Sequence, residues 1–284
     1  MKLSIVTPVV TMLPIEHARW EETGTLADVT RIAEAADRLG YDNLTCSEHV
    51  AVPVAIAVQR GARYWDPLAT FGYLAARTQN IRFMTNVLVL GYHHPLAIAK
   101  RYGTLDLVSG GRLVLGLGVG TLQEEFELLG AQFEGRGAVA DDAMRALRAS
   151  LSQREPVYHG EHYSYEGFIV DPCAVQDRVP LWVGGRTLLS LRRAATLGDG
   201  WAPFAVPLKQ AAEWLGQVDA PVGFDVVLRP ARPFDPSGQP DVTTEVLGKM
   251  RTAGATIVAS TFVHHSVDHY LEQLEALVAL NAAL

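Results

Sequence analysis

A histidine beside a carboxylate stands at the end of an extended run in this 284-residue chain. The run 42–47 reads as a strand, and its last residue, Ser47, is followed by Glu48 and His49. A neighbouring carboxylate and imidazole can move a proton, so Glu48 and His49 are predicted to be catalytic. A histidine at a strand end is also often structural, and the sequence leaves that alternative open.

A second signal comes from glycines that alternate along one predicted strand. Gly116, Gly118 and Gly120 lie on one face, because successive side chains of a strand point to opposite faces. This bare face predicts the close approach of a flat ring cofactor. The alternative is a tapering barrel interior that needs small residues there. On the opposite face, Leu115 and Leu117 are expected to pack against helices.

A third candidate is the junction where Gly184 and Gly185 precede Arg186 and Thr187. A helix is predicted to begin here, and the free N–H groups and positive dipole end of a helix N-terminus attract an anion. Arg186 can clamp a phosphate through two parallel hydrogen bonds. The junction therefore predicts a phosphate cradle, and a solvated arginine in the first helical turn is the alternative.

The remaining histidines give no metal-binding pattern. The adjacent pairs His93-His94 and His264-His265 have diverging side chains, so we expect no metal site. His94 is expected to cap the helix that begins at Pro95. The chain also lacks the G-x-S-x-G motif of serine hydrolases.

These candidates must be positioned by a repeating fold, because β-like runs alternate with helical patterns along the chain. Eight such units favour a closed (β/α)8 TIM barrel, an α/β fold of about 250 residues whose sites form at the carboxyl ends of the strands. A doubly wound open sheet is the alternative, but its G-x-G-x-x-G fingerprint is absent. We expect one domain, 1–284, with a hairpin insertion at 156–171 before the fifth strand. The predicted strands are 3–8, 42–47, 81–90, 112–120, 181–183, 201–204, 222–228 and 256–260.

Composition limits the partners and the location. The formal net charge is −7, with 24 basic against 31 acidic residues and no basic run, which argues against nucleic acid or an anionic membrane as a partner. No apolar stretch reaches the roughly 18 residues of a membrane-spanning helix, and the N-terminus lacks the pattern of a signal peptide. Cys46 and Cys173 have neither metal nor disulfide spacing, so we expect reduced thiols in a cytoplasmic protein with small-molecule partners.

Several motifs together resemble the bacterial luciferase-like superfamily. They are Ser47-Glu48-His49, Gly91-Tyr92-His93-His94-Pro95, Gly118-Val119-Gly120 with Glu124-Glu125-Phe126, Leu181-Trp182-Val183-Gly184-Gly185-Arg186 and Leu197-Gly198-Asp199-Gly200-Trp201. Over residues 1 to about 205, the chain is most similar to the coenzyme F420 (deazaflavin)-dependent oxidoreductases of this superfamily. The resemblance implies a (β/α)8 barrel, often a homodimer, that binds a flavin or deazaflavin at its mouth.

The resemblance also implies roles for individual residues. His49 would lie beside the reactive ring, Asn86 and Val87 would hold the back face of the ring, and the peptide bond between these two residues would be cis. The phosphate would bind near Gly184. The implied cofactor contacts are Ser47, Asn86, Val87, Gly118, Gly120, Gly184, Gly185, Arg186 and Thr187.

Three functions are compatible with this resemblance. The first is F420-dependent hydride transfer to or from a small organic substrate, and the second is a two-component monooxygenase that uses reduced FMN. The third is a non-catalytic flavin-binding protein. Thr121 and Pro53 stand where the sugar-phosphate dehydrogenases of the family carry a carboxylate and a tryptophan, which argues against sugar-phosphate oxidation. Variable loops such as 50–63 and 156–171 are expected to select the substrate.

Overall fold

The strands of the computed structural model, which describes residues 1–14 and 17–284, pair side by side into a closed parallel barrel. Around the ring the order is β1, β2, β3, β5, β8, β9, β10, β11 and back to β1, and β4 continues β3 along β5. This arrangement confirms the predicted (β/α)8 barrel. The strands are β1 (Lys2–Val6), β2 (Asn43–Cys46), β3 (Arg82–Thr85), β4 (Leu88–Val89), β5 (Leu113–Gly118), β8 (Leu181–Gly185), β9 (Gly200–Pro203), β10 (Asp225–Leu228) and β11 (Ile257–Ser260).

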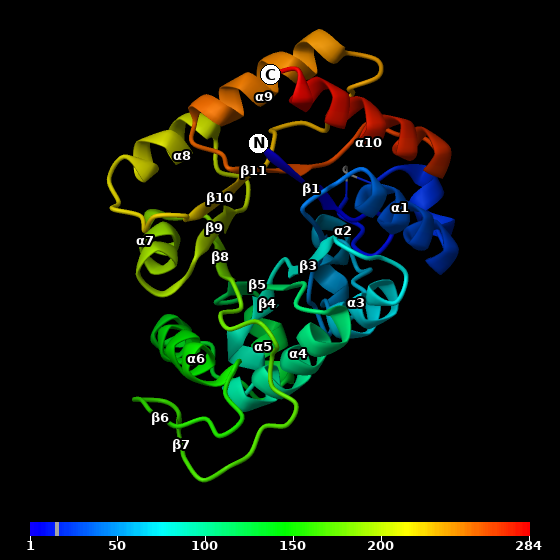
Figure 1. Cartoon of the computed structure of the whole chain (residues 1–284). Helices are drawn as coiled ribbons and strands as arrows, with labels where there is room; N and C mark the ends of the chain where they lie inside the picture. The colour runs from blue at the N-terminus through cyan, green and yellow to red at the C-terminus, as the bar shows by residue number, and fades with distance from the viewer. Residues whose placement is uncertain (15–16) are drawn as a thin grey trace.

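Helices form the outer layer around these strands (Figure 1). The last helix, α10 (Val267–Ala282), packs beside α1 (Leu26–Arg38), so the final unit of the chain closes on the first. Short helices, α2 (Ala57–Arg60) and α5 (Gln123–Leu128), lie in the loops that follow β2 and β5. The other helices are α3 (Pro67–Ala75), α4 (Pro95–Ser109), α6 (Arg136–Ser150), α7 (Leu188–Leu197), α8 (Leu208–Leu215) and α9 (Pro240–Thr252).

The alternation of side chains along the strands separates two hydrophobic clusters. Leu115 and Leu117 of β5 belong to the larger cluster, which joins the strands to the helices, as the sequence predicted. Side chains of the opposite parity fill the barrel interior. This inner cluster contains Met84, Val114, Trp182, Ala202, Val227 and Ile257.

Asn86 and Val87 interrupt a stretch, 81–90, that the sequence predicted to be one continuous strand. The peptide bond between them is cis, as the resemblance implied. Two groups at the end of β2 hold this segment: the hydroxyl of Ser47 donates to the carbonyl of Asn86 at 2.8 Å, and the Cys46 carbonyl accepts the N–H of Asn86 at 2.8 Å. The interruption is therefore fixed by the neighbouring strand.

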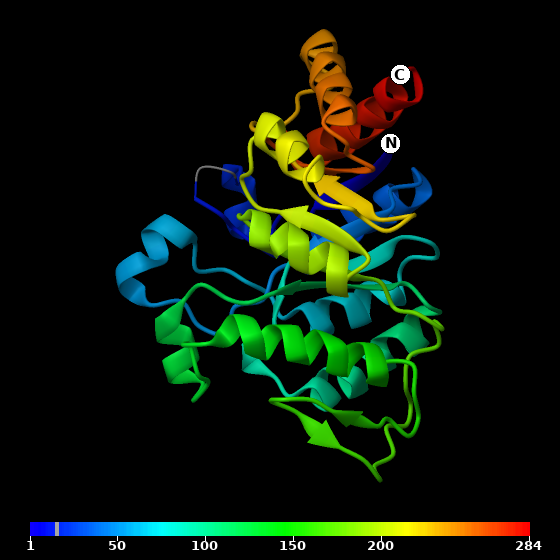
Figure 2. The same ribbon diagram turned by 90° about the vertical axis from the view of Figure 1, so that its left-hand side faces the viewer.

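The predicted hairpin insertion is formed by β6 (Tyr158–His159) and β7 (Ser164–Tyr165), which pair antiparallel and pack against α6 (Figure 2). Asp142 of α6 accepts hydrogen bonds from the Tyr158 hydroxyl at 2.5 Å and from the N–H groups of His162 at 2.7 Å and Tyr163 at 3.0 Å. Burial acts to raise the pKa of Asp142, but these hydrogen bonds outweigh it and hold the pKa below its ordinary value. One ionised carboxylate thus anchors the insertion.

Neither cysteine forms a disulfide. Cys46 is buried, and burial raises the pKa of its thiol to about 12, which leaves it protonated and unreactive. Within residues 1–14 and 17–284, no helix has the length and apolar character needed to cross a membrane.

Candidate functional site

The loops at the carboxyl ends of the strands carry the residues that the sequence singled out. The loop after β2 contains α2, and this segment projects from one side of the barrel (Figure 2). The loop after β1 pairs with it, because the N–H of Met12 donates to the carbonyl of Arg63 at 3.1 Å and the N–H of Trp65 donates to the carbonyl of Val10 at 2.9 Å. Together these two loops wall one side of the barrel mouth.

His49 lies at the mouth in contact with a buried carboxylate from another strand unit. Its Nδ1 is 2.6 Å from Oε2 of Glu125, which belongs to the first turn of α5. The Glu125 side chain is fully buried, whereas that of His49 is 18% exposed. The same carboxylate accepts hydrogen bonds from the Tyr92 hydroxyl at 2.8 Å and from the N–H groups of Val50 at 2.6 Å and Ala51 at 3.1 Å. His49 and the loop that follows it are therefore fixed by Glu125.

Glu125 is ionised in this arrangement. Burial acts to raise its pKa, but hydrogen bonds from His49, Tyr92 and Ala51 outweigh burial and hold the pKa below its ordinary value. An ionised carboxylate only accepts hydrogen bonds, so Nδ1 of His49 carries a proton. When the imidazole is neutral, Nε2 is its basic nitrogen and can take a proton from a bound molecule. Tyr64 packs edge-on against the imidazole, with 4.5 Å between ring centroids.

The predicted site included neither Glu125 nor Tyr92. Both stood in the motifs of the resemblance, but the sequence does not tell which loop residue reaches His49. One feature of the sequence could have indicated Glu125 as the partner of His49. Glu124 and Glu125 begin a helix directly after a predicted strand, and a carboxylate there lies at the same end of a barrel as the histidine.

Gly120 allows α5 to pack close to the end of β5. Its φ is +78°, and a Cβ at this position would lie 2.5 Å from Cε2 of Phe126 in α5. Both the backbone conformation and the space therefore require glycine. Because Phe126 follows Glu125 directly, Gly120 helps to place the carboxylate that holds His49.

Glu48 does not join this network. Its Oε1 is 2.7 Å from Nε2 of His93, and its Oε2 accepts the N–H of Val89 at 2.8 Å. Both carboxylate oxygens thus bind groups of the segment that follows β3, and Glu48 ties the end of β2 to β4. These contacts favour a positioning role for Glu48 over the catalytic role predicted beside His49.

Val87 is wedged between glycines of two neighbouring strands. A Cβ on Gly118 would lie 2.4 Å from Cγ2 of Val87, and a Cβ on Gly184 would lie 2.7 Å from its Cγ1. A Cβ on Gly116 would meet the carbonyl oxygen of Thr85 at 1.9 Å. The expectation of a bare face is therefore wrong for Gly116 and Gly118, because atoms of the chain itself cover these glycines. The alternative interpretation, small residues required inside the barrel, accounts for both.

The junction of β8 and α7 presents a cation at a helix N-terminus. Thr187 is the N-cap of α7, and its hydroxyl accepts the N–H of Ser190 at 3.3 Å. Gly185 has a φ of +136°, which L side chains rarely adopt, where the chain turns toward α7. Arg186 is exposed and has no hydrogen-bond or ion-pair partner among the described residues. The junction fits an anionic group, and the bound phosphate remains a prediction.

No group of three or more His, Cys, Asp or Glu side chains in the described part of the chain is arranged to hold a metal ion. The neighbours His93 and His94 diverge, as predicted. His93 contacts Glu48, whereas His94 caps α4 by accepting the N–H of Leu96 at 3.2 Å.

Comparison with known proteins identifies relatives of this barrel. Residues 7–228 match the family model described as luciferase-like monooxygenase. An uncharacterised protein of Mycobacterium tuberculosis is 30% identical over 182 residues, which cover 60% of this chain and 62% of that protein. An F420-dependent glucose-6-phosphate dehydrogenase of Microbacterium testaceum is 27% identical over 173 residues, which cover 58% of this chain and 49% of that enzyme. The match thus spans less than two thirds of the length of either relative.

A solved structure shares the whole architecture. The monooxygenase RslO1 of Streptomyces bottropensis superposes with a TM-score of 0.80 at 20% identity, covering 100% of this chain and 99% of that chain. At this level of identity the likeness shows a common fold, which agrees with the closed parallel barrel.

Proposed function

The chain belongs to the luciferase-like monooxygenase family, and on that basis we propose that it is an F420-dependent oxidoreductase that transfers a hydride between bound deazaflavin and a small organic substrate. The contact between His49 and the buried carboxylate of Glu125 at the barrel mouth carries the proposal. An alcohol that loses a hydride must also lose a proton, and a carbonyl that gains a hydride must gain one, so the reaction needs a proton carrier beside the ring. One relative is by name an F420-dependent dehydrogenase, which supports deazaflavin as the cofactor.

The residues at the mouth fit such a cofactor. Arg186 and the N-terminus of α7 would hold its phosphate, because the cation has no partner among the described residues and free N–H groups favour an anion. Asn86 and Val87 are partly exposed and would support the back face of the ring. When bound, the deazaflavin supplies the ring carbon that accepts or donates the hydride.

His49 performs the proton step in this proposal. During oxidation of an alcohol, its Nε2 takes the proton of the hydroxyl group while its Nδ1–H stays bonded to Glu125. The buried carboxylate stabilises the imidazolium that forms. During reduction of a carbonyl, the same imidazolium gives its proton to the oxygen.

A two-component monooxygenase that takes reduced FMN from a separate reductase is the second candidate. The description of the matching family names monooxygenases, which favours it. The features at the start of α7 suit the phosphate of FMN as well as that of F420. His49 would then hold a proton near the ring for the oxygenation of the substrate.

Cofactor titration of the purified protein, followed by ultraviolet-visible absorption, distinguishes the two candidates. We expect F420 to bind with a Kd at least tenfold lower than that of FMN, and the reverse order would favour the monooxygenase. Turnover is then assayed with a panel of alcohols and ketones. Tight cofactor binding without turnover across the panel would instead indicate a non-catalytic flavin-binding protein.

The variant His49→Ala tests the proton step. We expect turnover to fall by about 10² to 10⁴-fold, while the Kd of the cofactor changes much less. Equal losses in both quantities would contradict a role in the reaction and leave His49 as part of the binding site alone.

A further inference from the structure

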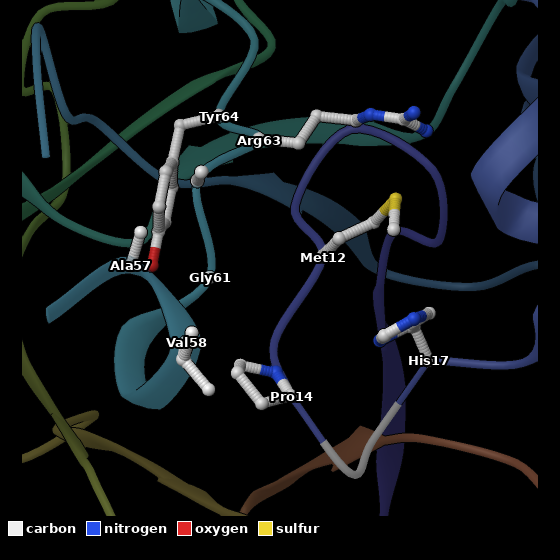
Figure 3. A pocket seen from close by; sticks show the side chains of 9 residues that line it. Met12, Pro14, His17, Ala57, Val58, Gly61, Arg63 and Tyr64 are labelled. Carbon is white, nitrogen blue, oxygen red and sulfur yellow. The ribbon is translucent and has the colours of Figure 1, made fainter. Parts of the chain in front are cut away.

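A hollow of about 690 Å³ opens beside Tyr64, whose ring contacts His49. It is lined in part by the loop 50–63, which the sequence predicted to help select the substrate, and none of the cofactor roles assigned above uses it. One wall comes from the loop after β1, with Met12 and Pro14, and the other comes from the segment 57–64 after β2 (Figure 3). The junction of β8 and α7, where the phosphate is proposed to bind, does not line it. The hollow is therefore separate from the proposed phosphate site.

Most of the lining is apolar. Met12 and Pro14 face Ala57 and Val58 across the hollow in Figure 3. The side chain of Val58 is 81% exposed, and that of Val54 in the same loop is 91% exposed. Apolar side chains held at an open hollow gain free energy when an apolar molecule covers them.

Arg63 is the one arginine in the described lining, and its guanidinium is already engaged. Nη1 donates to the carbonyl of Glu21 and Nη2 donates to the carbonyl of Glu22, each at 2.7 Å. Figure 3 shows this guanidinium extending away from Tyr64. The neighbouring Arg60 does not line the hollow and donates instead to the hydroxyl of Thr121 at 3.3 Å. No described lining residue offers an unpaired cation to an anionic ligand.

The other polar side chains of the described lining, Tyr64 and His17, also have partners, and Nε2 of His17 lies 3.9 Å from Oε1 of Glu22. The hydroxyl of Tyr64 donates to the carbonyl of Arg60 at 2.7 Å, and Nδ1 of His17 donates to the carbonyl of Leu13 at 2.9 Å. The aromatic ring of Tyr64 lines the hollow and also contacts the His49 imidazole edge-on, with 4.5 Å between the ring centroids. A molecule that packs against Tyr64 is therefore separated from His49 by the Tyr64 ring.

We propose that this hollow binds the apolar body of the substrate and that the substrate is a neutral, largely hydrophobic molecule rather than an anion such as a sugar phosphate. The assignment of the occupant as substrate rests on the proposed function, whereas the binding preference rests on the lining alone. An anionic group placed here would leave water without gaining an unpaired cationic side chain from the described lining residues in exchange, which is costly. A ketone or alcohol at the Tyr64 end would bring its polar group toward His49.

The test uses 2-octanone as the neutral probe and octanoate as an anion with the same number of carbons, both without cofactor. The protein is labelled with ¹³C in its methionine methyl groups, and Met12→Leu assigns the Met12 signal. We expect 2-octanone to shift the Met12 signal saturably and octanoate to bind at least tenfold more weakly. Equal affinity for the two probes would overturn the proposal.

Two variants place a carboxylate on the lining, Ala57→Asp and Val58→Asp. We expect each to weaken 2-octanone binding at least fivefold. Val58 is 81% exposed, so a carboxylate there stays in water and we expect this variant to fold. Val222→Asp is the matched control, because Val222 is fully exposed outside the hollow, and it should leave binding unchanged. Unaltered binding in Val58→Asp would contradict the assignment of the hollow.

The same variant separates this proposal from the proposed function. We expect Val58→Asp to change the Kd of the cofactor less than twofold, so the proposal for the hollow and the proposal for the cofactor site are tested independently.

Discussion

Nδ1 of His49 and Oε2 of Glu125 lie 2.6 Å apart, although 76 positions separate the two residues in the chain. The carboxylate collects four donors, two from side chains and two from the backbone of the loop after β2. Such a site suits a carboxylate and not an amide, because the NH₂ group of a glutamine would meet donors where it needs acceptors. Glu125 thus both orients the imidazole and supplies the counter-charge for its protonated form.

Glu125→Gln should therefore impair turnover more than cofactor binding. We expect kcat to fall by about tenfold or more, with a smaller change in the Kd of the cofactor, because Glu125 acts through His49. Steady-state kinetics and cofactor titration on the same preparation check this. Tyr92→Phe is the milder comparison, since it removes one hydrogen bond to the carboxylate and keeps the charge. A Glu125→Gln enzyme with the kcat of the parent would remove Glu125 from the proton step.

Arg186→Ala should weaken the binding of phosphate-bearing cofactors selectively. The side chain is exposed and unpaired among the described residues, so its removal costs the fold little. We expect the Kd of FMN to rise about tenfold, as for the loss of one charge-assisted hydrogen bond, and the Kd of riboflavin, which lacks the phosphate, to stay constant. Arg192→Ala changes the net charge equally, and Arg192 is an exposed residue further along α7. Parallel losses for FMN and riboflavin would argue against a phosphate contact.

Gly118→Ala should destabilise the barrel, because the new methyl group would lie 2.4 Å from Cγ2 of Val87. Overpacking of this kind costs about 1–3 kcal/mol. The second substitution in Gly118→Ala/Val87→Ala removes the clashing methyl groups and should recover part of that loss, a coupling that a double-mutant cycle measures by denaturant unfolding. In Gly72→Ala the added methyl group has open space within a helix, so this control should be neutral or slightly stabilising. Additive losses in the cycle would show that Val87 is not what fills the face of Gly118.

The order of elements in this fold follows directly from the sequence, because alternating strands and helices leave few ways to close a barrel. The predicted strand 81–90 is two strands in the structure, β3 and β4. The local sequence pattern does not predict the break between them, because both halves are apolar and well suited to a strand. The interruption depends on partners elsewhere, such as the hydroxyl of Ser47 and the space over Gly118.

The candidate site, too, could be predicted only in part. His49 was found because it directly follows a predicted strand, and the place of a residue relative to a strand can be inferred from the local sequence pattern. The pairing of its imidazole with Glu125 could not be inferred in this way, since that contact depends on how two loops fold over the mouth. The alternating glycines indicated a place of close approach, and the atoms of the chain that approach them belong to the Thr85 carbonyl, Val87 and Phe126. A missing side chain shows that something is near and does not say what it is.

His264 makes the stability of the protein sensitive to mild acid. Its Nδ1 accepts a hydrogen bond from Nε1 of Trp20 at 2.8 Å, and its Nε2 lies 3.4 Å from Oε1 of Glu21. Burial, assisted by the positive charges of His269 and His265, lowers its pKa from 6.5 to about 4. Between these two values the unfolded chain binds more protons than the folded protein, so stability is full above pH 6.5 and falls as the pH drops toward 4.

The substitution His264→Gln should remove this dependence, because glutamine can still accept from Trp20 and does not titrate. We expect the free energy of unfolding of the parent to fall by about 1–2 kcal/mol more than that of the variant between pH 7 and pH 5, measured by urea unfolding at each pH. Burial raises the pKa of Glu21, which by itself would favour the folded state as the pH falls and so opposes the effect of His264 in the parent. His265→Gln replaces an exposed neighbour and should leave the slope nearly intact. Identical slopes in the parent and His264→Gln would mean that the acid sensitivity arises from other groups.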